Sequence, residues 1–452
     1  MSVLHKDCPG PRQVECRRFR RTLFADFFAR VVFVAALTVS VVGLSDDARD
    51  GGIAKWDPLM TAQRAVVDAN GMKWIDGKLL PLEGKAFANV EAFYDRLPSG
   101  VTTNVNAGVR EMKHHTAGMQ FRFATDSKRL ELRWKPYEPT LAYPNLSSIG
   151  ASGIDVYRRE DGRWIYVASG AAANVRDGGS LSLAWTPGET CLVNLPLYNG
   201  IREFSLGIDG GASVSPPPAR QSGVDKPVVF YGTSITQGGC ASRPGLSFVN
   251  WIGRELDVPV VNLGFSGSGV MELEMSEHLA KIDASCYVLD CLWNMRVRER
   301  DLPGRAIETN YEPFIRNLRA KRPGVPIVMA EQSDVRHRGP IEDDVFIRKL
   351  YERLLAEGWS NLVYLSKDKM YADDSEGSVD GIHPNDLGMQ TMKDVYGEAV
   401  RKALEFEFRD NTGAAVRMNG RLVLTFDDKR NIASWLAARE VFRKYDAHVT
   451  FF

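Results

Sequence analysis

Five apolar runs of strand length, separated by segments with helical spacing, constrain the fold of this chain more than any other feature. The runs are residues 228–231, 258–263, 286–292, 326–330 and 361–365. Between them, apolar residues recur at intervals of three and four, for example at Met271, Met275, Leu279 and Ile282. Buried strands that alternate with helices predict a parallel sheet covered by helices on both faces. A three-layer α/β/α domain is therefore expected over residues 226–405.

The preceding part of the chain, residues 55–215, has a different pattern. Short runs of alternating apolar and polar residues lie between turn residues, as at Phe121, Phe123 and Leu130. The pair Asp161-Gly162 between two such runs is typical of a hairpin turn. Regular short strands of this kind predict an all-β sandwich, similar to a jelly roll. Three consecutive prolines, 216–218, then predict a stiff and exposed linker between the two domains.

Polar residues that acyl transfer requires follow the predicted parallel strands. Ser234 follows the first strand after a glycine, Gly267 follows the second, and Asn294 ends the third. Asp380 and His383 come after the fifth strand. The carboxyl ends of parallel strands meet at one edge of a sheet, so we expect these five residues to lie together. They would supply a nucleophile, a backbone donor, an amide donor, and a base with its orienting carboxylate.

These residues resemble the conserved blocks of the SGNH/GDSL hydrolases, a family with a flavodoxin-like α/β/α fold. Ser234 matches the serine of block I, and Gly267 and Asn294 match blocks II and III. Asp380 and His383 match the final DxxHP motif. The resemblance implies a serine esterase without a cofactor. Its triad would be Ser234, His383 and Asp380, with Ser234, Gly267 and Asn294 forming the oxyanion hole.

The block sequences also indicate a branch of the family. Block I reads GTSIT in place of GDSL, and block III lacks its usual Gly and Asp, as in the bacterial branch associated with carbohydrate esters. Residues 153–157, GIDVY, resemble the GxDLY motif of the domain that precedes such esterases. The resemblance implies an acylated oligo- or polysaccharide as substrate, with an O-acetyl group as the ester.

Two alternative functions remain open at this stage. The same triad would serve a lipid acyl hydrolase or an acyltransferase. A non-catalytic carbohydrate-binding protein is the alternative from another class. In that protein the sandwich would present a platform of tryptophans to a sugar, drawn from Trp56, Trp74, Trp134, Trp164 and Trp185.

The first 45 residues are typical of an export signal. A cluster of four arginines between Arg17 and Arg21 precedes a short apolar run, residues 31–44. We expect a periplasmic or extracellular protein with no stable membrane partner once the signal is removed, and an N-terminal membrane anchor is the alternative. The chain has 57 basic and 57 acidic residues, so its formal charge gives no reason to expect a nucleic-acid partner.

Residues 420–452 resemble the opening of a polysaccharide deacetylase domain. Their TFDD motif places Asp427 as the base and Asp428 as a metal ligand of that family. The histidine-rich second motif does not follow, so we interpret the segment as a truncated domain or as part of a longer bifunctional protein. The esterase itself is expected to need no metal.

Overall fold

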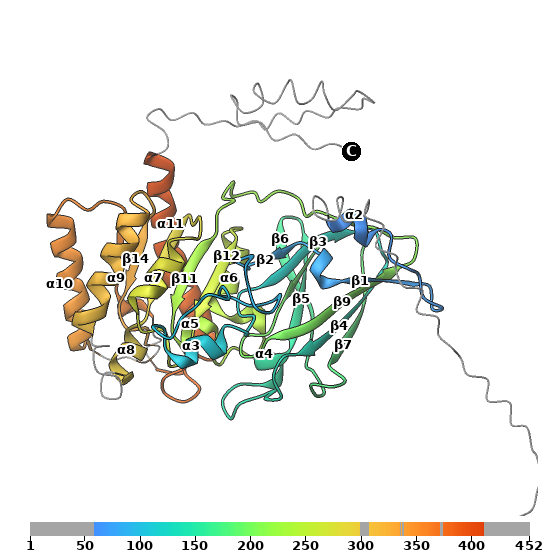
Figure 1. The fold of residues 1–452 in the computed structure, drawn as a ribbon, viewed down its shortest axis with the longest axis horizontal. Helices are drawn as coiled ribbons and strands as arrows, with labels where there is room; N and C mark the ends of the chain where they lie inside the picture. The colour runs from blue at the N-terminus through green and yellow to red at the C-terminus, as the bar shows by residue number, and fades with distance from the viewer. Residues whose placement is uncertain (1–57, 299–306, 335, 337–338, 371–373, 411–452) are drawn as a thin grey trace, which may run out of the picture. The chain divides into compact units, whose positions relative to one another are not determined.

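The computed structural model describes residues 58–298, 307–334, 336, 339–370 and 374–410 (Figure 1). The predicted export segment lies outside these residues, as do Trp56 and the deacetylase-like segment with Asp427 and Asp428. Within the described chain, no helix is both long enough and apolar enough to cross a membrane.

The first domain is a sandwich of two antiparallel sheets. One sheet has the strand order β1-β9-β4-β7, and the other has the order β10-β3-β8-β5-β6 with β2 paired to β3. Its strands are β1 (Met72–Asp76), β2 (Leu82–Glu83), β3 (Gln120–Thr125), β4 (Arg129–Pro136), β5 (Ile154–Glu160), β6 (Arg163–Gly170), β7 (Gly179–Ala184), β8 (Thr190–Asn194), β9 (Ile201–Asp209) and β10 (Val214–Ser215). Three short α-helices belong to the same part of the chain: α2 (Pro58–Ala62) before the first strand, and α3 (Ala107–Met112) and α4 (Ser148–Ser152) between later strands.

The two sheets enclose an aromatic core. Trp134, Phe121 and Phe204 are buried between them, and the Trp134 indole donates to the Ser152 carbonyl at 3.1 Å. Trp185 belongs to the same core. Because Trp134 and Trp185 are buried, they cannot form part of a sugar platform on the surface of the sandwich.

The second domain contains a five-stranded parallel sheet with the order β12-β11-β13-β14-β15. Its strands are β11 (Val228–Gly232), β12 (Val260–Gly264), β13 (Cys286–Asp290), β14 (Ile327–Ala330) and β15 (Leu362–Leu365). The expected fold class, an all-β sandwich followed by a three-layer α/β/α domain, is confirmed. The third strand is shorter than expected. It ends at Asp290, and helix α8 (Leu292–Arg298) begins almost at once.

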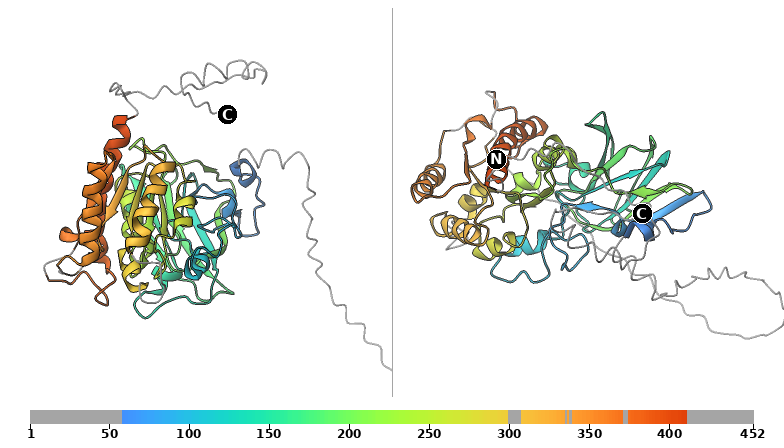
Figure 2. Two further views of the ribbon diagram at one scale, coloured as in Figure 1. Left: turned by 60° about the vertical axis from the view of Figure 1, so that its left-hand side comes forward. Right: turned by 90° about the horizontal axis from the view of Figure 1, so that it is seen from above.

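Alternate residues of each parallel strand point to opposite helical layers. Val229 and Tyr231 pack in the layer of α7 (Leu273–Leu279), α9 (Ile307–Lys321) and α10 (Glu342–Ala356). Val228 and Phe230 pack in the layer of α6 (Phe248–Glu255) and α11 (Asp386–Asp410). The sheet therefore lies between two helical layers, as Figure 2 shows from two directions.

One buried carboxylate joins the two domains. Asp155, in β5, is fully buried and accepts hydrogen bonds from Arg243 Nη1 at 2.9 Å and from the Gly245 N–H at 2.8 Å. Its other oxygen accepts from Asn194 Nδ2 at 2.8 Å. Tyr157, also in β5, bonds to Arg243 through its hydroxyl. The aspartate and tyrosine of the GIDVY motif therefore hold the segment that follows the first parallel strand and its short helix.

A second connection is apolar. The long segment between β2 and β3 leaves the sandwich, and three of its residues, Leu97, Val105 and Val109, pack in the core of the α/β domain. The linker region is also fixed in place. Arg220, just after the three prolines, is buried and pairs with Asp257 and Glu83. The two domains thus share a packed and charged interface.

We expect Asp155→Ala to lower the free energy of unfolding by about 3 kcal/mol, because the change removes the charge partner of Arg243 and the acceptor of the buried Asn194 and Gly245 donors. Chemical denaturation measures the effect. Glu160→Gln, at the exposed end of the same strand, is the control and should match the wild type. An Asp155→Ala protein as stable as the control would show that the buried carboxylate does not hold the interface.

Candidate active site

Ser234 lies where the first parallel strand turns into a helix. Strand β11 ends at Gly232, and helix α5 (Ser234–Gln237) begins at Ser234. The Thr233 hydroxyl caps this helix by accepting from the Ile235 N–H at 3.2 Å. The sheet edge comes very close to the helix here, since a Cβ atom on Gly264 would lie 2.2 Å from the Gln237 nitrogen. The serine side chain is half-buried at the carboxyl end of the sheet.

Three side chains form a continuous line of hydrogen bonds. Ser234 Oγ lies 3.0 Å from His383 Nε2, and His383 Nδ1 lies 2.8 Å from Asp380 Oδ2. The loop before α11 carries both His383 and Asp380. The structure therefore brings Ser234 together with His383, which lies 149 positions further along the chain, and with Asp380. This arrangement can transfer a proton from a serine hydroxyl to a histidine that a carboxylate orients.

The Asp380 carboxylate is held in its charged form. Partial burial opposes ionisation, but donors around the carboxylate outweigh it and keep its pKa well below the usual range. These donors are the backbone N–H and ring of His383, the side-chain amide of Asn145 and the N–H of Ile382. Asn145 Nδ2 donates to the same oxygen, Oδ2, at 2.7 Å. Because Asn145 belongs to the sandwich domain, that domain contacts the triad directly.

The two remaining sequence candidates lie on neighbouring elements. Gly267 is in the loop after β12 and has a φ of 63°, which suits glycine. The sequence predicted that Asn294 ends the third strand, but the residue lies in the first turn of α8. Its side chain is buried and donates to the Phe265 carbonyl at 3.0 Å. Asn294 is therefore bonded to the loop that contains Gly267.

A buried network connects the sandwich to the nucleophile helix. The Gln237 side chain accepts from the Ser266 N–H at 2.9 Å and donates to the Leu197 carbonyl at 3.0 Å. Its amide nitrogen also lies 2.9 Å from His115 Nδ1. Tyr198 donates its hydroxyl to the Ser234 carbonyl at 2.8 Å. His115, Leu197 and Tyr198 thus fix both the short helix of Ser234 and the loop of Gly267 from the sandwich side.

Two further residues of the first domain hold the Gly267 loop. Arg96 is fully buried, donates to the Gly264 carbonyl at 2.7 Å and stacks its guanidinium 4.5 Å from the Phe265 ring centre. Asn106 donates to the Ser268 carbonyl at 2.7 Å. The loop is therefore held in one position by groups from outside its own domain.

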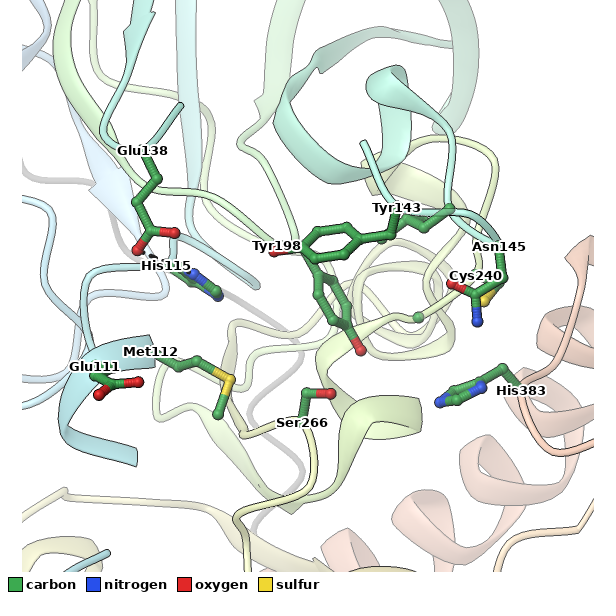
Figure 3. Close-up of a pocket in the computed structure, with 12 residues that line it drawn as sticks. Glu111, Met112, His115, Glu138, Tyr143, Asn145, Tyr198, Cys240, Ser266 and His383 are labelled. Carbon is green, nitrogen blue, oxygen red and sulfur yellow. Dashed lines mark ion pairs between the residues drawn. The ribbon is translucent and has the colours of Figure 1, made fainter. Parts of the chain in front are cut away.

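A pocket of about 400 Å³ opens beside the triad. The sandwich domain supplies most of its wall, as Figure 3 shows. The lining residues are Glu111, Met112, His115, Glu138, Tyr143, Asn145, Leu146, Tyr198, Gly239, Cys240, Ser266 and His383. Most of these side chains carry a polar group, so the pocket suits a ligand rich in hydrogen-bonding groups.

Cys240 also lines this pocket, and its sulfur lies within 4.8 Å of ligand atoms of Asp380 and His383. Burial, with a contribution from the Asp380 charge, raises the pKa of the Cys240 thiol to about 12. The thiol is therefore protonated at neutral pH and a poor nucleophile. The histidine ring instead faces Ser234.

The sandwich residues that reach the site could not be predicted from the sequence. Asn145 is 235 positions from Asp380, and His115 is 122 positions from Gln237. No periodic pattern or motif marks either of them. Gln237 could have been predicted from the sequence, because it lies three residues after Ser234 and therefore on the same face of the helix.

Comparisons with known proteins agree with the motifs. The model of the GDSL-like lipase/acylhydrolase family matches residues 225–401. The GxDLY family, described as the N-terminus of SGNH-hydrolase-type esterases, matches residues 72–214. The resemblance inferred from the residue motifs is thus confirmed. None of the curated proteins matches this chain.

Two solved structures are similar to both domains. A protein from Bacteroides ovatus, named as a GDSL-like lipase, is 28% identical with a TM-score of 0.64, covering 74% of this chain and 98% of its own. The salicylyl-acyltransferase SsfX3 from a tetracycline biosynthetic pathway is 17% identical with a TM-score of 0.57, covering 75% of this chain and 98% of its own. At 17% identity, the similarity to SsfX3 shows a shared fold and nothing further.

We expect Asn145→Ala to raise the pKa of Asp380, because the carboxylate loses one of its donors. The shift is measured by NMR titration that follows the side-chain carboxyl carbon of isotope-labelled aspartate. A carboxyl group whose pKa falls on folding stabilises the protein above its unfolded pKa and loses this contribution in acid. The stability difference between wild type and variant should therefore be greatest above about pH 4 and shrink below it.

Asn104→Ala, at an exposed asparagine of the same domain, provides the control and should leave the Asp380 titration unchanged. An unaltered Asp380 titration in Asn145→Ala would show that the sandwich domain does not act on this carboxylate.

Proposed function

We propose that Ser234, His383 and Asp380 are the catalytic triad of this chain and that it removes O-acetyl groups from carbohydrates. The proposal builds on the domain at residues 225–401, which is of the GDSL-like lipase/acylhydrolase family and makes the chain an esterase or acylhydrolase. One observation carries the proposal more than any other. It is the unbroken line of hydrogen bonds from Ser234 Oγ through His383 to Asp380, at 3.0 and 2.8 Å.

The proposed reaction has two halves. His383 Nε2 takes the proton of Ser234 Oγ while the oxygen attacks the ester carbonyl carbon, and the anionic Asp380 stabilises the resulting imidazolium. The C–O bond to the alcohol then breaks, and the imidazolium protonates the leaving oxygen. In the second half, water attacks the acyl-serine with His383 as base again, and the carboxylic acid leaves as Ser234 recovers its proton.

In the proposed reaction, three hydrogen-bond donors stabilise the negative charge that develops on the carbonyl oxygen. As the first residue of α5, Ser234 has a backbone N–H without an acceptor inside the helix. The Gly267 N–H and the Asn294 side chain are the other two proposed donors. One amide hydrogen of Asn294 is used by the Phe265 carbonyl, and the second remains to reach the substrate. The bond to Phe265 fixes the orientation of the amide before substrate arrives.

The composition of the pocket wall favours an ester of a hydroxylated alcohol over a lipid ester as the substrate. A long acyl chain is bound best by an apolar channel, because each buried CH₂ contributes about 0.8 kcal/mol. Here the wall carries two carboxylates, two histidines, two tyrosines and an asparagine, with Met112 and Leu146 as its larger aliphatic side chains. Such a wall favours a sugar ring, whose hydroxyl groups find partners on every side. An exported protein, as residues 1–45 suggest, would meet such polysaccharide esters outside the cell.

We expect Ser234→Ala to fold normally and to lose nearly all release of acetate from aryl acetates and acetylated polysaccharides, because the nucleophile is absent. His383→Ala should lose a comparable factor, since the triad acts as a unit. Acetate release and labelling by an active-site phosphonate measure the two effects. Cys240→Ala, which keeps the triad, is the matched control and should retain labelling. Ser234→Ala that still released acetate at wild-type rates would rule out the proposed nucleophile.

For Asn294→Ala we expect kcat to fall by about 10²–10³ with little change in KM, as the loss of one oxyanion donor does. Steady-state kinetics on an aryl acetate separate the two constants. Asn317→Ala, on helix α9, serves as the control for a lost asparagine amide. If Asn294→Ala altered KM alone, Asn294 would be a substrate-binding residue.

A further inference from the structure

The pocket beside the triad has an acidic end. Its twelve lining residues include two carboxylates, Glu111 and Glu138, and neither lysine nor arginine. Figure 3 shows both carboxylates on the side of the pocket away from His383, while Asn145 and Cys240 lie near the histidine. A ligand that extends from the reacting serine into this space therefore places its distal part near negative charge.

His115 does not neutralise Glu138. The amide of Gln237 must present its oxygen to the Ser266 N–H and its nitrogen to the Leu197 carbonyl, so its NH₂ group also faces His115 Nδ1. That nitrogen must then be an acceptor, which puts the proton of a neutral ring on Nε2. Nε2 lies 3.5 Å from Glu138 Oε1. Burial lowers the pKa of the His115 ring, in agreement with this assignment.

Glu138 itself is anionic and reachable. Its side chain is about one-third exposed (34%), and the adjacent His115 ring holds the pKa of the carboxyl below its usual range. His114, which also contributes to the lowered pKa of Glu138, pairs with Asp95 at 2.7 Å. Arg96, a cation near the His115 ring, is fully buried. Its terminal nitrogens donate to the backbone carbonyls of Asn262, Gly264 and Met112. Arg96 thus directs these donors into the protein and not toward the pocket.

Two tyrosine rings lie between the acidic end and the histidine. Tyr143 and Tyr198 pack edge to face, with ring centres 5.7 Å apart and planes at 68°. Figure 3 shows them in the middle of the pocket. Aromatic faces beside a carboxylate attract ammonium groups through the ring quadrupole as well as through charge. Anionic ligands would be repelled by the same wall.

We propose that this pocket selects esters whose alcohol carries a cationic ammonium group, as in an amino sugar with a free amine, and that Glu138 is the residue that determines this selectivity. The inference rests on the proposed function in one respect. If the acyl group is acetyl, it needs little room, and the pocket of about 400 Å³ takes the alcohol side of the ester. Glu138 touches the alcohol and not the reacting atoms, so it acts on specificity.

A pair of esters of nearly identical shape tests the proposal. Acetylcholine has a trimethylammonium group where 3,3-dimethylbutyl acetate has a neutral tert-butyl group. We expect kcat/KM to be about tenfold higher for acetylcholine, the effect of a cation in contact with aromatic rings and a carboxylate. Glu138→Gln should remove most of this preference, and Glu111→Gln should remove a smaller part of it. Glu352→Gln, which removes an exposed carboxylate from α10, should leave the ratio unchanged.

A second measurement does not depend on turnover. Binding of choline and of 3,3-dimethylbutanol to Ser234→Ala, observed by ligand NMR, should favour choline, and adding Glu138→Gln should remove most of the preference. Equal kcat/KM for the two esters, with hydrolysis still dependent on Ser234, would overturn the inference and leave the esterase intact. Preferential binding of choline by a protein that hydrolyses no ester would support the acidic pocket and contradict the proposed function.

Discussion

The fully buried carboxylate of Asp155 is the constraint on which the rest of the site depends. A buried charge is tolerated when it is paired and hydrogen-bonded, and Asp155 meets this condition with donors from both domains. Since removal of either partner would leave an unpaired buried group, the two domains are held in one relative position. The segment that carries Arg243 follows the helix of Ser234 directly. The position of the sandwich is thereby coupled to the position of the nucleophile.

Through this coupling the sandwich forms part of the candidate active site. Three segments that carry candidate catalytic groups are contacted by residues of the first domain: Tyr198 bonds to Ser234, Arg96 to the loop of Gly267, and Asn145 to Asp380. These bonds hold the groups in place before substrate arrives, which is how a hydrolase lowers the cost of organising its transition state. The same domain forms most of the pocket wall. In the proposed function it would therefore act on both the chemistry and the choice of alcohol.

The fold and the centre of the site were predictable because they depend on local patterns. Apolar runs mark the parallel strands, and Ser234 and His383 stand beside glycine and proline in short motifs at strand ends. The start of α8 was missed because apolar residues continue past Asp290, the last residue of the strand, into the first turn of the helix. Asn145, His115 and Tyr198 were missed for a different reason. Their partners are contacts between domains, and no local pattern records such a contact.

A double-mutant cycle on Asn145 and Asp380 tests most directly whether the sandwich domain acts through the triad. The values of kcat/KM for an aryl acetate are compared among the wild type, Asn145→Ala, Asp380→Ala and the double variant. If Asn145 acts by holding Asp380, its removal lowers kcat/KM in the wild-type background and has little further effect once Asp380 is gone. If Asn145→Ala lowers kcat/KM by the same factor in both backgrounds, the two residues act independently and the account is contradicted.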